Sequence, residues 1–313
     1  MSVAYFYNSE IRNNGTAVRC WDAGGRPKRY SRPGVDVQEH DLYIMIDDGR
    51  DDIEWLPPRP NALWCVDTHL GYEQRLKWAR EFDTVFCAQV DGAQKMKVDG
   101  IENVHWLPLA CHPPSDPSVG ELLAHPGKEE ILGKHGLEKQ YDVCFVGFLN
   151  MGVEGDEDSH NRVDFLDMMF KEFPNFHIST NCFFEHAAAR YIRSRVGLNL
   201  SIKHDLNMRF FEAMSYGVAQ LCNRDQLGWK ELGFEENVHF YGFESEEEAV
   251  VKAHWMLANP VEREETAKRA FDFVRNGHTY ADRMQGLIET CLGPQEAQQV
   301  QAQDSSQEAQ AES

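Results

Sequence analysis

Short apolar runs alternate with longer amphipathic or polar segments along most of this chain. The clearest runs span residues 42–46, 62–66, 84–88 and 142–147. Within each run, the side chains on both alternating faces are mostly apolar. Such runs predict strands that are buried on both faces, and the helical segments between them predict parallel connections. The pattern therefore indicates the α/β class, with open sheets covered by helices.

The stretch from residue 198 to residue 223 contains the most informative succession of elements. Its apolar start, 198–202, predicts a strand, and the polar residues 203–207 predict a turn. An amphipathic helix follows, and Gly217 stands where that helix needs a left-handed exit. Residues 218–222 predict the next strand. Because open α/β sheets bind ligands at the carboxyl ends of their strands, the turn is a candidate binding loop.

The turn and the start of this helix carry residues suited to a nucleotide. Asp205 or Asn207 can cap the helix. Free backbone N–H groups at a helix start suit a phosphate, and Lys203 and Arg209 flank that end, where they can neutralise a diphosphate. Glu212 lies about one turn further in, and its carboxylate can accept hydrogen bonds from both hydroxyls of a ribose. The residue types alone leave an ordinary solvated Arg209–Glu212 pair as the alternative.

Composition narrows the classes of protein to which the chain can belong. Its 313 residues suggest two domains, and a hydrophobic content of 42% supports a core in each. The net charge of −20 argues against a protein that binds along nucleic acid or an anionic membrane. The eight cysteines are scattered without a C-x-x-C pair, which predicts free thiols in a reducing cytoplasm and no zinc site. We find no secretory signal pattern and no run of the roughly 18–20 apolar residues that a membrane helix needs.

Several motifs follow one another in an order that is more specific than any one of them. They are 106–111 (WLPLAC), 141–147 (YDVCFVG), 207–214 (NMRFFEAM) with Gly217, 228–233 (GWKELG), 261–270 (VEREETAKRA) and 277–283 (GHTYADR). Together they resemble the donor-domain signature of GT-B glycosyltransferases, and in particular the CgeB-like group of spore maturation proteins. The resemblance covers roughly residues 40 to 292.

The resemblance implies a fold and a division of the chain. A GT-B protein has two Rossmann-like domains that face a cleft, and its C-terminal helix crosses back to the first domain. We therefore expect an acceptor-side domain at 1–138, a donor domain at 139–277 and a crossover helix at 278–292. Residues 293–313 contain no aromatic side chain and are expected to form a disordered tail.

The resemblance also implies an activity and a set of donor contacts. It implies transfer of a sugar from a nucleoside-diphosphate sugar, with retention of configuration and without a metal or a cofactor. Catalytic roles would belong to His69, Arg209 and Lys203. The expected donor-binding residues are Gly147, Arg162, Lys203, Asn207, Arg209 and Glu212. Many retaining relatives carry a second Glu near the sugar, eight residues before the position of Glu212, where this chain has His204.

Candidate acceptor-side residues follow two predicted strands in the first half of the chain. Arg12 and Asn13 lie in the polar loop after a short apolar run at 3–7, which predicts the first strand. Asp67 and His69 come directly after the run at 62–66. The resemblance favours His69, because these enzymes often bring a His from the acceptor domain to the donor sugar. A His can hydrogen-bond a sugar hydroxyl and orient it. The alternative is that His69 caps the helix expected at 72–82 or simply faces solvent.

Two alternative functions stay open at this stage. The chain can be a catalytically silent GT-B module with a structural or glycan-binding role, which His204 in place of Glu favours. It can also be a transferase that acts on modified DNA bases, although the acidic charge and the lack of a basic stripe in residues 1–138 weigh against nucleic acid. The expected partners are a nucleotide-sugar and a glycan, protein or small-molecule acceptor.

Overall fold

The structure contains two compact α/β units, and each is built around its own, mainly parallel sheet. Unit 1 comprises Met1–Pro108 and Ala281–Ser313, and unit 2 comprises Leu109–Tyr280. The computed structural model describes residues 3–7, 18–21, 27–30, 39–47, 56–111, 139–149, 157–180, 182 and 184–293. The expected passage near residue 138 and the expected tail, apart from Gly293, lie outside these residues. Two parallel sheets with helices confirm the predicted α/β class.

The sheet of unit 1 has the strand order β3-β2-β1-β4-β5-β6-β7. From β1 to β7 the neighbours pair in parallel, whereas β2 pairs antiparallel with both β1 and β3. The strands are β1 (Val3–Tyr7), β2 (Val18–Trp21), β3 (Pro27–Tyr30), β4 (Leu42–Asp47), β5 (Asn61–Cys65), β6 (Thr84–Cys87) and β7 (Val104–Trp106). The helices are the 3₁₀ turn η1 (Thr68–Leu70), α2 (Tyr72–Ala79), α3 (Val90–Val98) and α11 (Tyr280–Leu292).

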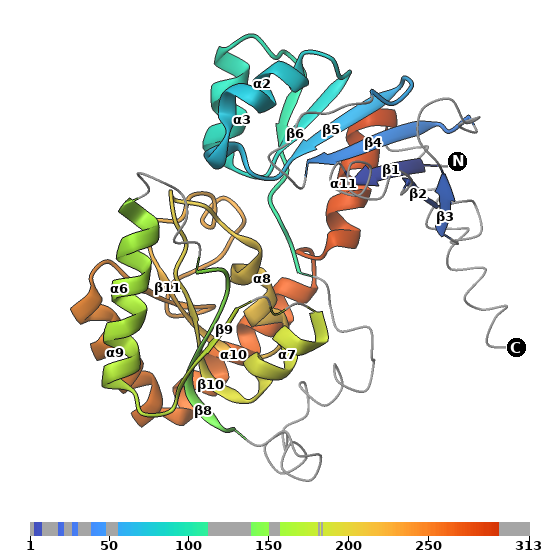
Figure 1. Cartoon of the computed structure of the whole chain (residues 1–313). Coiled ribbons are helices and arrows are strands. Elements are labelled where there is room, and N and C mark those ends of the chain that lie inside the picture. Colours follow the sequence, from blue (N-terminus) through green and yellow to red (C-terminus); the bar gives the residue numbers. More distant parts are fainter. Residues whose placement is uncertain are drawn as a thin grey trace, which may run out of the picture. The chain divides into compact units, whose positions relative to one another are not determined.

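Helices α2 and α3 cover one face of this sheet (Figure 1). The apolar cluster between them and the sheet includes Met45 of β4, Cys65 of β5, Leu76 of α2 and Met96 of α3. Every residue of β4 and β5 is buried, because both faces of these central strands are covered. Packing on both faces therefore fixes the position of the carboxyl ends of β4 and β5.

The sheet of unit 2 has the order β12-β11-β10-β8-β9, and all its pairs are parallel. The strands are β8 (Tyr141–Val146), β9 (Phe176–Ser179), β10 (Ser194–Asn199), β11 (Ala219–Asn223) and β12 (Tyr241–Phe243). The helices are α6 (Glu157–Glu172), α7 (Phe184–Ile192), α8 (Met208–Ser215), α9 (Glu246–Ala258) and α10 (Pro260–Arg275). The chain order reverses between β8 and β10, and ligands bind at such a switch point in doubly wound sheets.

Helices cover both faces of this second sheet (Figure 1). On one face, α6 and α9 pack over Phe145, Leu198 and Leu221. On the other face, α7, α8 and α10 pack over the alternate residues of the same strands, among them Cys144 and Cys222. This two-sided burial explains why the strands read as continuous apolar runs in the sequence.

The structure corrects two local predictions about secondary structure and adds one helix that the sequence did not predict. The sequence pattern predicts one helix over residues 183–195, but α7 ends at Ile192 and β10 already begins at Ser194. Arg195 can lie in a strand because its guanidinium pairs with Asp142 of the neighbouring β8, at 3.1 Å. Residues 22–36 are rich in Gly, Pro and Arg, which predicts irregular structure, but they contain β3, which pairs with β2. Helix α3 was not predicted, because its central residues are polar and its apolar face is small.

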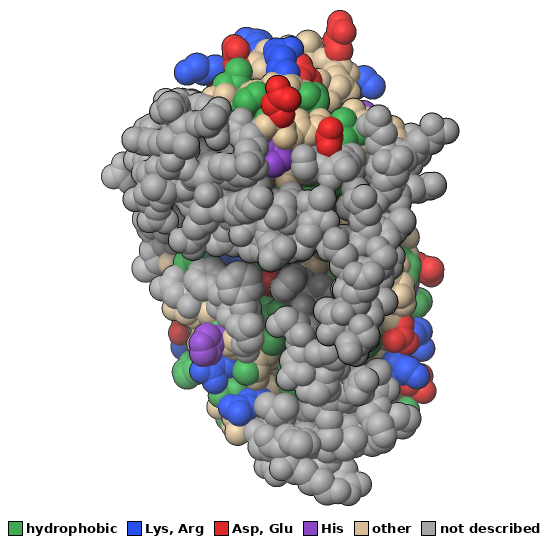
Figure 2. Space-filling model, turned by 90° about the vertical axis from the view of Figure 1, so that its right-hand side faces the viewer, with side chains coloured by type: hydrophobic (Ala, Val, Ile, Leu, Met, Phe, Trp, Pro, Cys, Tyr) green, Lys and Arg blue, Asp and Glu red, His purple; other side chains and the backbone are tan. Residues whose placement is uncertain are grey.

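On the face shown in Figure 2, acidic and basic side chains lie interspersed on the described surface. No helix among the described residues combines the length and apolarity needed to cross a membrane. Of the eight cysteines, seven have described side chains and all seven are free thiols, as predicted.

Candidate functional site

The β10–α8 loop begins with an unusual backbone turn. Lys203 and His204 have φ angles of 51° and 58°, a left-handed conformation that few non-glycine residues adopt. The N–H of Asp205 donates to the carbonyl of Ile202 at 3.1 Å, which closes the turn. Two consecutive left-handed residues in the middle of such a turn correspond to type I′ geometry, which usually requires Gly or Asn. The turn exposes the Lys203 side chain to solvent.

His204 points to the next loop of the same unit. Its Nδ1 lies 3.0 Å from Oδ2 of Asp225 and 3.2 Å from the Asp225 carbonyl oxygen. The backbone carbonyl of His204 also accepts a hydrogen bond from the N–H of Leu227, at 2.9 Å. The position where many relatives carry a sugar-side Glu is therefore occupied by a side chain that pairs with the β11 loop.

Asn207, and not Asp205, caps helix α8. Its backbone is extended, and its side-chain oxygen accepts a hydrogen bond from the N–H of Phe210 at 3.2 Å. Phe210 and Phe211 are fully enclosed, and Phe210 packs edge-on against Phe234 with 4.9 Å between ring centroids. The cap and these two anchors fix both the start and the rotation of α8. Gly217 follows with φ of 69°, the left-handed exit that the sequence predicted.

Asn199, the last residue of β10, joins the cap to Arg209. Its Oδ1 accepts from Nδ2 of Asn207 at 3.1 Å and from Nε of Arg209 at 3.4 Å, and the side chain is 1% exposed. Sequence reasoning missed Asn199, although a polar residue inside the apolar run 198–202 was a usable signal. The Arg209 backbone is held separately, because its carbonyl accepts from Nε2 of the buried Gln220 at 3.0 Å.

The guanidinium of Arg209 lies over the end of β8. Its Cζ is 5.7 Å from the centroid of the Phe145 ring. A Cβ atom added to Gly147 would lie only 2.8 Å from Nη1 of Arg209, so a side chain at this position would displace the guanidinium from where it lies. Gly147, Asn199 and Arg209 therefore meet at the switch point between β8 and β10. No described group hydrogen-bonds either terminal nitrogen of this guanidinium, which leaves both available to an anion.

Glu212 follows Arg209 by one helical turn and is half-buried. Burial raises the pKa of its carboxyl to about 7, and the nearby Arg209 charge opposes this rise. Among the described residues, none donates a hydrogen bond to this carboxylate. Because the carboxylate is only half-buried, solvent can still hydrogen-bond to it, and the hydroxyls of a bound ligand could take the place of that water.

Arg162 lies near the same end of β8, where it holds the loop that follows Gly147. It is 8% exposed, and its Nη1 donates to the carbonyl of Phe148 at 2.9 Å. The structure thus places Arg162 beside the backbone of the β8–α6 loop. A purely structural role for Arg162 would produce the same contact.

In unit 1, Asp67 and His69 lie on the turn that follows β5. Asp67 precedes η1 and makes no side-chain cap hydrogen bond. His69 is half-buried, and its Nδ1 is enclosed and has no hydrogen-bond partner. It lies within η1, which ends at Leu70, so it does not cap α2, whose N-cap position is Gly71. Arg12 and Asn13 lie outside the described residues.

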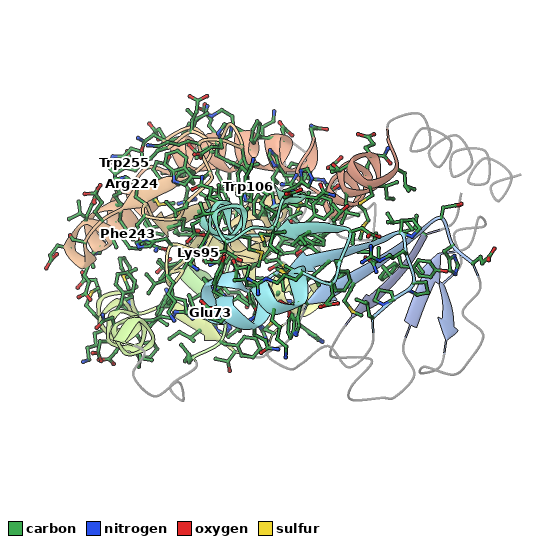
Figure 3. All side chains as sticks on the ribbon, turned by 90° about the horizontal axis from the view of Figure 1, so that it is seen from above. Glu73, Lys95, Trp106, Arg224, Phe243 and Trp255 are labelled. Atoms are coloured by element: carbon green, nitrogen blue, oxygen red, sulfur yellow. The ribbon has the colours of Figure 1, made fainter. Side chains whose placement is uncertain are left out.

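A second charged cluster lies at the carboxyl end of β11, on the side formed by β12 and α9. Figure 3 labels Arg224 there, together with Phe243 and Trp255. Nε and Nη2 of Arg224 each donate to a different oxygen of Glu236, both at 2.8 Å. Arg224 also pairs with Glu248, at 3.2 Å. These ion pairs tie the β11 loop to α9. In the part of the chain that the structure describes, no group of three His, Cys, Asp or Glu could hold a metal ion.

Comparison with protein families identifies the domain that carries this site. Residues 162–289 match the family model described as glycosyl transferase-like. A comparison with curated protein sequences gave no match. The family match confirms the predicted class of enzyme, a glycosyltransferase, whereas the narrower CgeB-like group stays a prediction.

Solved structures share the fold at low sequence identity. An α-glucosyltransferase in complex with UDP-glucose and DNA containing an abasic site is 10% identical, with a TM-score of 0.52 over 80% of both chains. HepE (Alr3699) of Anabaena in complex with UDP and glucose is 12% identical, with a TM-score of 0.53 over 80% of this chain and 77% of its own. Sucrose-phosphate synthase of Thermosynechococcus elongatus is 10% identical, with a TM-score of 0.53 over 79% of this chain and 72% of its own. Residues 162–289 therefore form a glycosyl transferase-like domain, in a chain with the GT-B glycosyltransferase fold.

Proposed function

We propose that this protein transfers a sugar from a uridine-diphosphate sugar to an acceptor, with the donor bound by unit 2. The observation that carries the proposal is the arrangement at the β8–β10 switch point. There, Arg209 is oriented by Asn199 over Gly147, and Glu212 stands one turn away, where no described residue donates a hydrogen bond to it. The comparisons support the choice of nucleotide, because HepE and the α-glucosyltransferase were solved with UDP or UDP-glucose.

Each group has a distinct role in this proposal. The diphosphate binds the N-terminus of α8 and the Arg209 guanidinium, with Lys203 as an additional point charge. Negative charge grows on the diphosphate as the glycosidic bond breaks, and these groups stabilise that charge without a metal. The two ribose hydroxyls donate to Glu212, where they take the place of water. Gly147 allows close approach of the ligand to the backbone, and Arg162 fixes the loop that follows it.

The proposal also includes the acceptor side and the stereochemistry of the transfer. We assign His69 and Asp67 of unit 1 to the acceptor side, and we expect retention of configuration. His204 pairs with Asp225, so the sugar-side contact that many relatives make through Glu needs another group in this chain. Cytoplasmic location and the absence of a resident cofactor are part of the same proposal.

The proposal is tested by binding and turnover with one matched control. Uridine, guanosine, adenosine and thymidine diphosphates are screened by thermal shift, since a ligand that binds only the folded state raises the midpoint. We expect the largest rise with UDP, and we expect Arg209→Ala to abolish it. The control Arg269→Ala removes a partly exposed arginine of α10 and should leave the rise unchanged. An equal rise in wild type and Arg209→Ala would refute the assigned site.

A silent binding module is the second candidate, and the His204–Asp225 pair is the observation that favours it. Release of UDP from a panel of UDP-sugars separates the two functions. Binding of UDP without any release across the panel, with candidate acceptors present, would favour the silent module.

A third candidate is transfer to modified DNA bases, which the α-glucosyltransferase neighbours suggest. The net charge of −20 opposes a protein that must hold a phosphate backbone. A DNA shift assay at low and high salt decides this point. We expect no salt-sensitive complex.

A further inference from the structure

One buried side chain holds the N-terminal half of the turn that carries His69. Gln89, at the N-cap position of α3, is 5% exposed. Its Oε1 accepts from the N–H of Thr68 at 2.9 Å and from the Thr68 hydroxyl at 2.7 Å. Its Nε2 donates to the carbonyl of Val66 at 2.8 Å. One amide therefore holds the backbone on both sides of Asp67.

The Thr68 side chain also packs closely against the start of α3. A Cβ atom added to Gly92, in the first turn of α3, would lie 2.2 Å from the Thr68 hydroxyl oxygen. The Thr68 side chain thus rests directly on the backbone of α3, and it is itself buried. The residue that immediately precedes His69 is fixed by hydrogen bonds and by steric contact together.

The other side of the turn is held by a buried ion pair. Nε of Arg75, in α2, lies 2.6 Å from Oδ2 of Asp47, the last residue of β4. Nη1 of the same guanidinium donates to the carbonyl of Gly71 at 3.2 Å. The side chains of Arg75 and Asp47 are 1% and 0% exposed. The backbone two residues after His69 is therefore tied to the end of the adjacent strand.

The buried ion pair is weak evidence that these supports serve mainly to stabilise the fold. Burying an ion pair carries a large desolvation penalty, and apolar side chains of similar volume often give equal or greater stability. Polar supports of this kind fix geometry better than they add stability, and functional side chains need such support to stay within a fraction of an ångström of the productive position. The ring that they support has an enclosed Nδ1, while its Nε2 is not enclosed.

We propose that Gln89 and the Asp47–Arg75 pair are positioning residues that hold His69 for sugar transfer. The proposal rests on the proposed function, and it adds residues of unit 1 to which that function assigns no role. They act through the His69 ring and do not touch the donor. Their removal should lower the rate of transfer and leave nucleotide binding by unit 2 unchanged.

A double-mutant cycle on transfer tests this proposal. Gln89→Met removes the hydrogen bonds to Thr68 and Val66 while keeping the side-chain length. We expect kcat to fall about 10- to 100-fold, because small displacements of a positioned group have effects of this size. The KM for the UDP-sugar and the affinity for UDP should stay within about twofold. In a His69→Ala background, Gln89→Met should have no further effect on kcat, because its effect passes through His69.

Two further measurements separate positioning from general destabilisation. Gln89→Glu keeps the oxygens that accept from Thr68, and it should restore part of the rate. The paired change of Asp47→Leu with Arg75→Met replaces the ion pair by apolar side chains, so the protein should stay folded while kcat falls. NMR of ¹³C-labelled histidine should show the His69 ring signal shifted or broadened in Gln89→Met, without any need for activity.

The outcomes distinguish failure of this inference from failure of the proposed function. Wild-type protein that neither binds UDP nor releases it from UDP-sugars overturns the function, and the inference with it. An active wild type in which the Gln89→Met and His69→Ala effects multiply overturns only the positioning role. So does an unchanged kcat in Gln89→Met, or a rise in KM for the donor that accounts for the whole loss.

Discussion

Replacing Glu212 by Gln should make the unliganded protein more stable while it weakens nucleotide binding. The pKa of this carboxyl is raised from 4.5 to about 7 by burial. The folded protein therefore binds a proton that the unfolded chain has lost between these two pH values. It follows that the free energy of unfolding of the wild type falls as pH rises through this window. The Gln side chain does not titrate, so the free energy of unfolding of the variant lacks this fall with pH.

The size of the effect follows from the same two pKa values. The difference between 4.5 and about 7 corresponds to about 3 kcal/mol above pH 7, at 1.36 kcal/mol per pH unit. This is an upper bound, because the buried Gln amide also loses hydrogen bonds to water. Urea unfolding of both proteins from pH 4.5 to pH 8 measures the difference. We expect it to be near zero at the acid end, to grow with pH, and to level off above about pH 7.

The affinity for the donor should rise with pH, whereas the free energy of unfolding falls. The ribose hydroxyls donate to the ionised carboxylate, so affinity for the donor should rise with pH, by at most about tenfold per pH unit below pH 7. UDP-glucose is the suitable probe, because its esterified diphosphate does not titrate near neutral pH. Calorimetry with Glu212→Gln should give weak binding that does not depend on pH. A Gln variant that is less stable than the wild type at pH 8, or that binds UDP-glucose as tightly, would refute the reasoning.

Three further substitutions test the supports of the site. Gly147→Ala places a Cβ atom 2.8 Å from Nη1 of Arg209, so UDP affinity measured by calorimetry should fall about tenfold while the thermal midpoint changes little. Asn207→Ala removes the cap of α8 and should lower the free energy of unfolding by about 1 kcal/mol in urea, and UDP affinity should fall as well. Arg224→Met leaves the half-buried Glu236 without its two-pronged partner and should cost about 2 kcal/mol in the same assay, with no direct effect on UDP binding. Unchanged affinity in Gly147→Ala, unchanged stability in Arg224→Met, or an Asn207→Ala protein identical to wild type would each contradict the corresponding contact.

The fold could be predicted from the sequence because its signals are local. Apolar runs gave most of the strands, and Asn207 and Gly217 marked the two ends of α8. The predictions failed where a distant partner decides the structure. Arg195 lies in β10 because Asp142 on the adjacent strand neutralises it, which local pattern does not reveal.

The site could be predicted only as far as charged residues and glycines define it. Arg209 and Gly147 were expected to bind the donor, and the structure brings them together. The neutral amides that orient the site, Asn199 and Gln220 in unit 2 and Gln89 in unit 1, were missed. An amide gains its role from hydrogen bonds to particular partners in the fold, and its residue type alone does not distinguish it from a surface amide. Of the three, Asn199 carried a signal through its place inside the apolar run 198–202.

The most direct test of the central claim is a crystal structure of the protein with bound UDP. Our proposal predicts the diphosphate at the N-terminus of α8, in contact with the Arg209 guanidinium, and both ribose hydroxyls within about 3 Å of the Glu212 carboxylate. A nucleotide bound elsewhere, with no ribose hydroxyl at Glu212, would contradict it.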